Sequence, residues 1–259
     1  MLRKPINIYH EMIKTIYQNY TSNVTELYEI YNAKYPISYT KFRENINVLA
    51  RNKFIDIKEI RTGITGGINT IILATEKGEI AAMNLADSII DIKEAEEMIN
   101  MHTTLEHGYF IKQCNKLLTE NGFKVFSDYN SCRFVTNLKT QRGRPKKIEA
   151  DLVINDNGGI IPVECETGKC PSINLINKLT TTKSRFDIIF ILCPNQKACN
   201  RTQKTVNEWL KKKESNEELM VIVINISSAI KNKNIKTTIR EYKDFYMSQI
   251  GNKYTTAQN

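Results

Sequence analysis

The chain has 259 residues, of which 41% are hydrophobic, and its formal net charge is +9. This apolar content excludes a disordered chain. The sequence also lacks a signal-peptide core and the roughly 18 uninterrupted apolar residues of a membrane span. We therefore expect a globular cytoplasmic protein without membrane contact. The charge is uneven, because residues 1–100 hold 12 Lys and Arg against 13 Asp and Glu, which leaves the whole excess to residues 101–259. Such a basic surface attracts nucleic acid, although it also serves solubility alone.

Three helices and a hairpin are predicted within residues 1–84. Apolar residues recur at helical intervals over 6–17, over 23–35 after a Ser22–Asn23 cap, and after Ser38, where Phe42, Ile46 and Leu49 share one face. Two extended runs, 54–60 and 69–74, flank the turn-rich segment 61–67 and predict a β-hairpin. An acidic, amphipathic connector or dimer helix is expected over 85–103.

This element order, closing with the phrase Leu-Ala-Thr-Glu-Lys-Gly at 73–78, resembles the winged helix-turn-helix fold. The resemblance implies that the third helix enters the major groove of DNA and that the hairpin touches the backbone or minor groove. The residues expected to meet DNA are Thr40, Lys41, Arg43, Asn45 and Asn47 on the helix, with Lys58 and Arg61 on the wing. Because this module has almost no net charge, docking of a partner protein through the winged helix is the alternative.

The second module, 104–259, alternates between helices and strands. Strands are predicted at 123–126, 150–154, 160–165, 188–193 and 219–226, and helices at 104–118, 172–183 and 198–213. This pattern is typical of an α/β arrangement with a mixed central sheet. The six cysteines all lie in this part, and without a CxxC pair they are expected to be free thiols. They are Cys114, Cys132, Cys165, Cys170, Cys193 and Cys199.

Four carboxylates occupy informative places in this module. Asp151 begins the second strand, the turn at 157–159 reverses the chain, and Glu164 and Glu166 then lie on one face of the third strand. The hairpin should bring Asp151 close to that pair, and Glu106 on the preceding helix could complete the cluster. Clustered carboxylates repel one another unless a cation joins them, and hard oxygen ligands suit Mg²⁺ or Mn²⁺.

The order helix-Glu, strand-Asp and then Glu-x-Glu at a strand end resembles the PD-(D/E)XK nuclease superfamily. The resemblance implies that Asp151, Glu164 and the main-chain carbonyl of Cys165 bind the metal, with Glu106 as accessory acid. Glu166 stands where the family usually has its catalytic Lys, so it could act as general base or hold a second metal. Alternatively, the cation is supplied by Lys169, which follows the strand, or by Lys178 or Lys183 on the next helix.

Two narrower resemblances concern the phrase Val-Glu-Cys-Glu-Thr-Gly-Lys at 163–169, which follows a winged helix in the chain. It is similar to the replication-relaxation proteins of plasmids and conjugative elements, which share this domain order. Mrr-type restriction nucleases also place a winged helix before the nuclease domain, but they carry Lys where Glu166 stands.

The segment Gln-Arg-Gly-Arg-Pro-Lys-Lys at 141–147 resembles the AT-hook, whose Arg-Gly-Arg-Pro core lies in the minor groove of A/T-rich DNA. The resemblance implies that Arg142, Arg144, Lys146 and Lys147 contact DNA from a basic loop just before Asp151. The alternative is a solvated loop without a partner.

The expected fold is therefore α+β and α/β, with a winged helix-turn-helix at 1–84, a connector at 85–103 and a restriction endonuclease-like domain at 104–259. The expected function is Mg²⁺-dependent hydrolysis of DNA phosphodiesters, and a homodimer is expected because cutting both strands normally requires two sites. The alternative is a non-enzymatic DNA-binding accessory or regulatory protein on an inactive nuclease fold.

Overall fold

A computed structural model of the chain describes residues 7–19, 23–64, 67–86, 104–156, 159–211 and 219–231. Contacts divide the chain into two units, one formed by 1–61 with 66–109 and the other by 62–65 with 110–259. The connector helix expected at 85–103 lies outside the described residues, apart from its first two positions.

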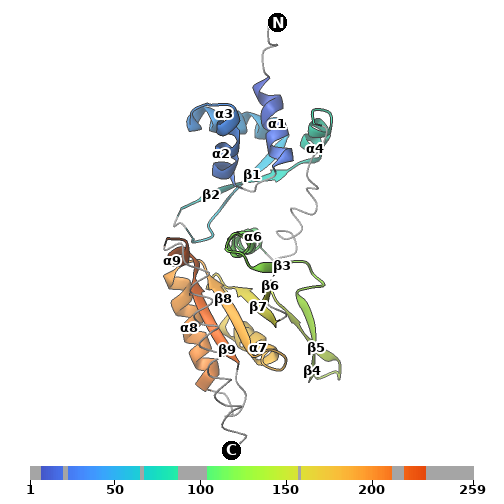
Figure 1. Ribbon diagram of the computed structural model, residues 1–259, viewed down its shortest axis with the longest axis vertical. Coiled ribbons are helices and arrows are strands. Elements are labelled where there is room, and N and C mark those ends of the chain that lie inside the picture. The colour runs from blue at the N-terminus through green and yellow to red at the C-terminus, as the bar shows by residue number, and fades with distance from the viewer. Residues whose placement is uncertain are drawn as a thin grey trace, which may run out of the picture. The chain divides into compact units, whose positions relative to one another are not determined.

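The first unit contains the three helices and the hairpin that the sequence predicts, together with a further helix, α4 (Glu76–Met83), that was not predicted (Figure 1). The side chains of Asn7, Asn23 and Ser38 each accept a hydrogen bond from a backbone N–H in the first turn of the helix that follows, which fixes where the three helices begin. The elements are α1 (Ile8–Gln18), α2 (Val24–Lys34), α3 (Tyr39–Arg51), β1 (Ile55–Ile60), β2 (Asn69–Ala74) and α4 (Glu76–Met83). The two strands pair antiparallel from Ile55 opposite Ala74 to Ile60 opposite Asn69.

The inner face of α3 corrects one predicted DNA contact. Phe42, Ile46 and Leu49 are buried as expected, but Asn45 is also buried, with 4% of its surface exposed. Position 45 is three residues after Phe42 and four before Leu49, so helical periodicity places it on the face toward the core. Asn45 therefore cannot read DNA from this helix, and its buried Nδ2 has no hydrogen-bond partner among the described residues.

A five-stranded mixed sheet organises the second unit, in the order β3-β6-β7-β8-β9 (Figure 1). Pairing is antiparallel from β3 to β7 and parallel from β7 to β9. The strands are β3 (Lys124–Phe126), β6 (Leu152–Asp156), β7 (Gly159–Cys165), β8 (Ile188–Cys193) and β9 (Met220–Asn225). The helices are α6 (Leu105–Glu120, in this unit from Phe110), α7 (Ser172–Thr182), α8 (Gln196–Lys211) and α9 (Ile226–Lys231). All five predicted strands are thus confirmed within a few residues.

Helices pack against both faces of this sheet. Leu179 of α7 and Trp209 of α8 share a core with Ile189 and Ile191 of β8, so these two helices cover the same face. The thiol of Cys165 on β7 instead makes a hydrogen bond with that of Cys114 on α6, which places α6 on the opposite face. Because neighbouring residues of a strand point to opposite faces, Glu164 points toward the α7 side.

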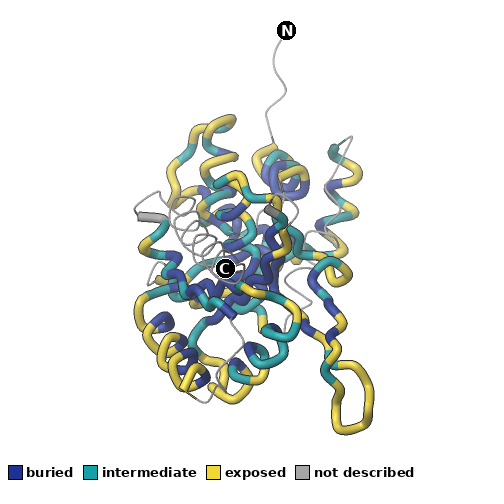
Figure 2. The backbone as a smooth tube through the Cα atoms, turned by 60° about the horizontal axis from the view of Figure 1, so that its bottom comes forward, coloured by how far each residue is buried: buried dark blue, intermediate teal, exposed yellow. Residues whose placement is uncertain are grey.

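The second unit also contains a two-stranded ribbon that the sequence reading did not predict. Strands β4 (Arg133–Lys139) and β5 (Pro145–Glu149) form an antiparallel hairpin apart from the main sheet. The expected basic loop at 141–147 is corrected accordingly: 141–144 form the turn, with Gly143 at a left-handed φ of 75°, whereas Lys146 and Lys147 belong to β5. Figure 2 shows the exposed tip of this hairpin.

Two further expectations concern side-chain chemistry and membranes. All six cysteines are free thiols, as predicted. Among the residues that the structure describes, no helix is long and apolar enough to cross a bilayer.

Candidate active site

Asp151 and Glu164 face one another where β6 and β7 pair. The register places Leu152 opposite Val163, so Asp151, one residue earlier, stands opposite Glu164, one residue later. The Oδ2 atom of Asp151 accepts a hydrogen bond of 2.8 Å from the backbone N–H of Cys165. The sequence predicted this convergence from the turn at 157–159, and the hydrogen bond holds the carboxylate of Asp151 at the end of β7.

Lys178 supplies the positive charge of the site. Its ammonium forms an ion pair with Oε2 of Glu164, a side chain that is only 1% exposed. Lys178 lies on α7, which follows β7 and packs on the face toward which Glu164 points. Of the three lysines considered from the sequence, the structure brings Lys178 to the acids.

Lys169, which was expected as a catalytic residue, is exposed in the loop after β7. The loop turns at Gly168, which has a left-handed φ of 74° and lies so close to α8 that an added Cβ would be 3.0 Å from the Cα of Ala198. The catalytic role expected for Lys169 stays a prediction, and Lys178 is the lysine that contacts Glu164.

The electrostatics of the cluster show an excess of negative charge. Burial raises the pKa of Glu164 to about 8; Lys178 opposes the shift, whereas the nearby carboxylates of Asp151 and Glu166 add to it. Burial alone would lower the pKa of Lys178, but Glu164, Asp151 and Glu166 together raise it above its ordinary value. Three carboxylates thus act on one ammonium, and a further cation in this place would be stabilised.

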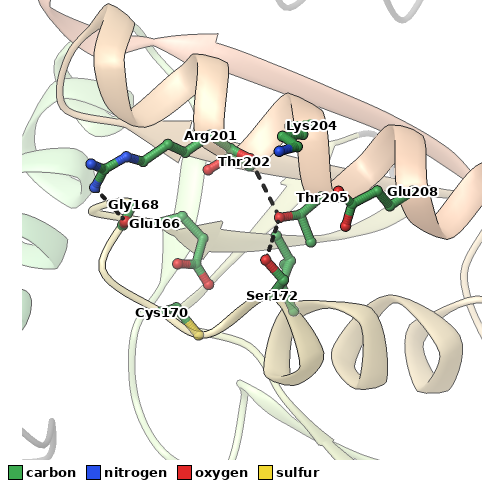
Figure 3. A pocket seen from close by; sticks show the side chains of 10 residues that line it. Glu166, Gly168, Cys170, Ser172, Arg201, Thr202, Lys204, Thr205 and Glu208 are labelled. Carbon is green, nitrogen blue, oxygen red and sulfur yellow. Dashed lines mark hydrogen bonds between the residues drawn. The ribbon is translucent and has the colours of Figure 1, made fainter.

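Glu166 lies beyond the end of β7, where its backbone N–H donates a 2.8 Å hydrogen bond to the carbonyl of Leu192 on β8. Its side chain, 7% exposed, lines a hollow of about 190 Å³ between the β7–α7 loop and α8. Figure 3 shows Glu166 in this hollow with Ser172 and Thr205, whose hydroxyls are hydrogen-bonded to one another, and with Arg201, which donates to the carbonyl of Gly168.

Glu164 lines a second hollow, of about 300 Å³, between β5 and α7. Lys147 and Glu149 contribute to it from β5, and Asn177 and Lys178 contribute from α7. Glu164 and Glu166 therefore face separate hollows on the α7 side of the sheet. The β5 wall was not predicted from the sequence. The alternation of Phe134, Thr136 and Leu138, followed by the turn at Gly143, is nevertheless typical of a hairpin.

Glu106, the expected accessory acid, is half-buried in the first turn of α6. It belongs to the first unit, whereas Asp151, Glu164 and Glu166 belong to the second, so its part in the cluster stays a prediction. Within the described ranges, no group of three or more His, Cys, Asp or Glu side chains is arranged to hold a metal ion. The cluster itself offers two facing carboxylates, Asp151 and Glu164, and Glu166 nearby.

The other expected DNA contacts are accessible to different degrees. On α3, Thr40, Lys41 and Asn47 are exposed and Arg43 is half-buried, and Lys41 forms an ion pair with Glu44 at 2.9 Å. On the hairpin of the first unit, Lys58 and Arg61 are exposed, with Lys58 paired to Asp56 at 3.2 Å. The basic side chains of the β4–β5 hairpin are also accessible: Arg142, Arg144 and Lys147 are exposed and Lys146 is half-buried.

Comparison with known proteins gives no family for this chain. No family model matches the sequence, and no curated protein matches it. A solved structure described as "Crystal structure of SSV1 F-93" aligns with 39% of this chain and 98% of its own length, at 21% sequence identity and a TM-score of 0.28. A TM-score this low carries no argument about fold or function.

Proposed function

We propose that this protein is a metal-dependent DNA endonuclease with a restriction endonuclease-like second unit of the PD-(D/E)XK type. The observation that carries the proposal is the placement of Asp151 opposite Glu164 at paired strand ends, with the ammonium of Lys178 on Glu164. The strand order supports it, because an antiparallel pair that leads into parallel strands through α7 puts the acids at the same end of β6 and β7, with the helical lysine beside them.

The two facing carboxylates supply the oxygen ligands that a hard divalent cation prefers. Asp151 and Glu164 would bind Mg²⁺ or Mn²⁺ together with the main-chain carbonyl of Cys165, and Glu166 would act as general base or help to hold a second ion. The bound metal supplies an activated water and stabilises the leaving 3′ oxygen. Lys178 would orient that water and offset charge on the phosphate, the part that Lys plays in the family at the position of Glu166 here.

DNA would be recruited by the first unit and by the β4–β5 hairpin. We propose that the first unit is a winged helix-turn-helix in which Thr40, Lys41, Arg43 and Asn47 of α3 face the major groove and Lys58 and Arg61 lie on the wing. Supporting this, all of these side chains are at least partly accessible. We further propose a homodimer, because two sites related by a dyad are needed to cut both strands.

A DNA-binding protein without hydrolytic activity is the second candidate. The direct ion pair between Lys178 and Glu164 favours it, because the ammonium already offsets part of the charge that would otherwise attract a metal. In that case the basic hairpin and the first unit would bind DNA, and the acidic cluster would be structural.

Supercoiled plasmid incubated with the protein and Mg²⁺ or Mn²⁺ separates the two candidates. We expect nicking by the wild type and a loss of at least about 100-fold in rate for Asp151→Asn, because the amide is a poor metal ligand and carries no charge. Glu120→Gln is the matched control, because Glu120 is an exposed carboxylate at the end of α6. Plasmid that is shifted in a gel but remains intact would support the DNA-binding candidate.

A further inference from the structure

The hollow between β5 and α7 suggests how a substrate would reach the buried Glu164. Its walls are formed by 147–149 of β5 and by residues of α7 from Asn174 to Thr182, and Glu164 lies between them. With 1% of its surface exposed, Glu164 can be approached only through an opening of this kind. We call it the β5–α7 groove.

Two lysines and two glutamates line the groove, and Lys147 is the one of them left to attract an anion. Lys147 is exposed, and its ammonium has no ion-pair partner among the residues that the structure describes. Glu149, the acid on the same strand, is paired with Arg133 at 3.1 Å, so its charge is offset outside the groove. Lys178 lies deeper in the groove in its ion pair with Glu164, and the exposed amide of Asn177 adds donors for hydrogen bonds. A phosphodiester entering here would meet Lys147 first and then Lys178.

The dimensions of the groove favour one strand over a duplex. Its α7 wall runs from Asn174 to Thr182, eight residue steps, which is about 12 Å at 1.5 Å per residue. At about 3.4 Å per nucleotide of a B-form strand, a wall of that length lies along about three nucleotides. The hollow of about 300 Å³ is small for a base-paired segment, whereas a single extended strand can place one phosphate and its sugar in it.

The hairpin that forms one wall is held firmly to the rest of the unit. Arg185, which follows α7, donates a 2.6 Å hydrogen bond to the carbonyl of Val135 on β4. The rings of Phe134 and Phe186 pack edge to face with centroids 4.9 Å apart. These contacts join β4 to the chain after α7. The groove is therefore already formed before a ligand binds, and no conformational entropy has to be lost to order its walls.

We infer that the β5–α7 groove binds a single strand of DNA, with Lys147 and Asn177 as positioning residues that hold a phosphate beside Glu164. The inference rests on the proposed function and names its substrate class: a strand that is single or locally unpaired, such as an end, a flap or an opened duplex. Lys147 acts through its charge on the phosphate, and Asn177 acts through hydrogen bonds from its amide.

The test measures binding without divalent metal, so that it does not depend on hydrolysis. Fluorescence anisotropy would follow a fluorescein-labelled oligo(dT) strand and a blunt duplex of equal length in EDTA, across a series of salt concentrations. For Lys147→Gln we expect strand affinity to fall about fivefold or more and the slope of log K against log salt to shrink by about 0.7, the value for one lost phosphate contact on a single strand. For Asn177→Ala we expect weaker strand binding with an unchanged slope, because no charge is removed.

Lys211→Gln is the control, because Lys211 is an equally exposed cation at the end of α8 and does not line the groove. Equal losses for Lys147→Gln and Lys211→Gln, or a loss of duplex binding in Lys147→Gln as large as its loss of strand binding, would overturn the inference. If Lys147→Gln alone weakens strand binding while the wild type never nicks plasmid, the groove assignment stands and the hydrolase proposal fails. If nicking depends on Asp151 but Lys147→Gln leaves strand binding unchanged, the hydrolase proposal stands and the groove assignment fails.

Discussion

Lys178 illustrates how a single residue can complete a site that the local motif leaves incomplete. The phrase around Glu164 and Glu166 lacks the expected lysine, and the sequence offered three replacements at 169, 178 and 183 without deciding among them. The decision comes from tertiary packing, because α7 lies against the face of the sheet to which Glu164 points. Spacing along the chain could not show this.

Glu164 gives a residue-scale prediction for the pH dependence of stability. Its folded-state pKa of about 8 lies above its ordinary value, so the folded protein binds this proton more tightly than the unfolded chain. The resulting stabilisation is fully present below the ordinary pKa and is lost as pH rises through about 8. In Glu164→Gln the group no longer titrates, so we expect the free energy of unfolding of the wild type, relative to this variant, to fall between pH 5 and pH 8.

Urea unfolding in EDTA at several pH values would measure that difference. Lys178 stays charged over this range. The variant's loss of the ion pair with Lys178 therefore changes the difference in free energy of unfolding by a constant amount and does not change how that difference varies with pH. Glu120→Gln, at an exposed acid, should show no such trend. A difference that stays flat or grows with pH would show that Glu164 does not take up a proton on folding.

The β4–β5 hairpin is the element whose charge we expect to matter most for the proposed DNA binding. Lys139, Arg142, Arg144, Lys146 and Lys147 fall within nine residues that contain no acid, and they extend from the tip to the groove. We expect Arg142→Gln with Arg144→Gln to weaken binding to an A/T-rich duplex and to lower the slope of log K against log salt by up to about 1.8, which is 0.9 for each lost phosphate contact.

The same double substitution also tests the AT-hook resemblance. If the two arginines enter the minor groove of A/T-rich DNA, the preference of the wild type for an A/T-rich over a G/C-rich duplex should disappear in the variant. The matched control is Lys197→Gln with Lys211→Gln, two exposed lysines of α8, which removes the same charge. Losses of equal size in both double variants would mean that the hairpin contributes only to overall charge.

Most elements could be predicted from the sequence, because their periodicity and caps are local. The stripe of Phe42, Ile46 and Leu49 located α3, and the apolar run at 188–193 located β8. The β4–β5 hairpin was not predicted, because its basic turn resembles the AT-hook and the alternation of Phe134, Thr136 and Leu138 is a short strand signal. In the site, the meeting of Asp151 with Glu164 followed from a short turn, whereas the roles of Lys178 and of the β5 wall depend on contacts distant in sequence.

At the scale of the whole molecule, each of the two units has its own hydrophobic core among the described residues. One includes Leu27 of α2, and the other includes Leu179 of α7; both side chains are buried. We therefore expect calorimetry to resolve two unfolding transitions. Leu27→Ala and Leu179→Ala should each lower the midpoint of a different one, since removing a buried leucine costs about 2–5 kcal/mol within its own core.

Exposed substitutions provide the comparison, and Asn47→Ala on α3 should leave both midpoints nearly unchanged. A single transition that both core variants shift together would contradict the division into two independently stable units. That outcome would mean that the two cores unfold cooperatively.

The hydrogen bond between Asp151 and the backbone N–H of Cys165 also helps to fix the register between β6 and β7. A slip of one residue between β6 and β7 would turn every side chain of the moving strand to the opposite face, and Glu164 would then point toward α6 and away from Lys178. The carboxylate of Asp151 reaches that amide only in the native alignment. The residue that we assign to catalysis thus also helps to reject the misaligned hairpin during folding.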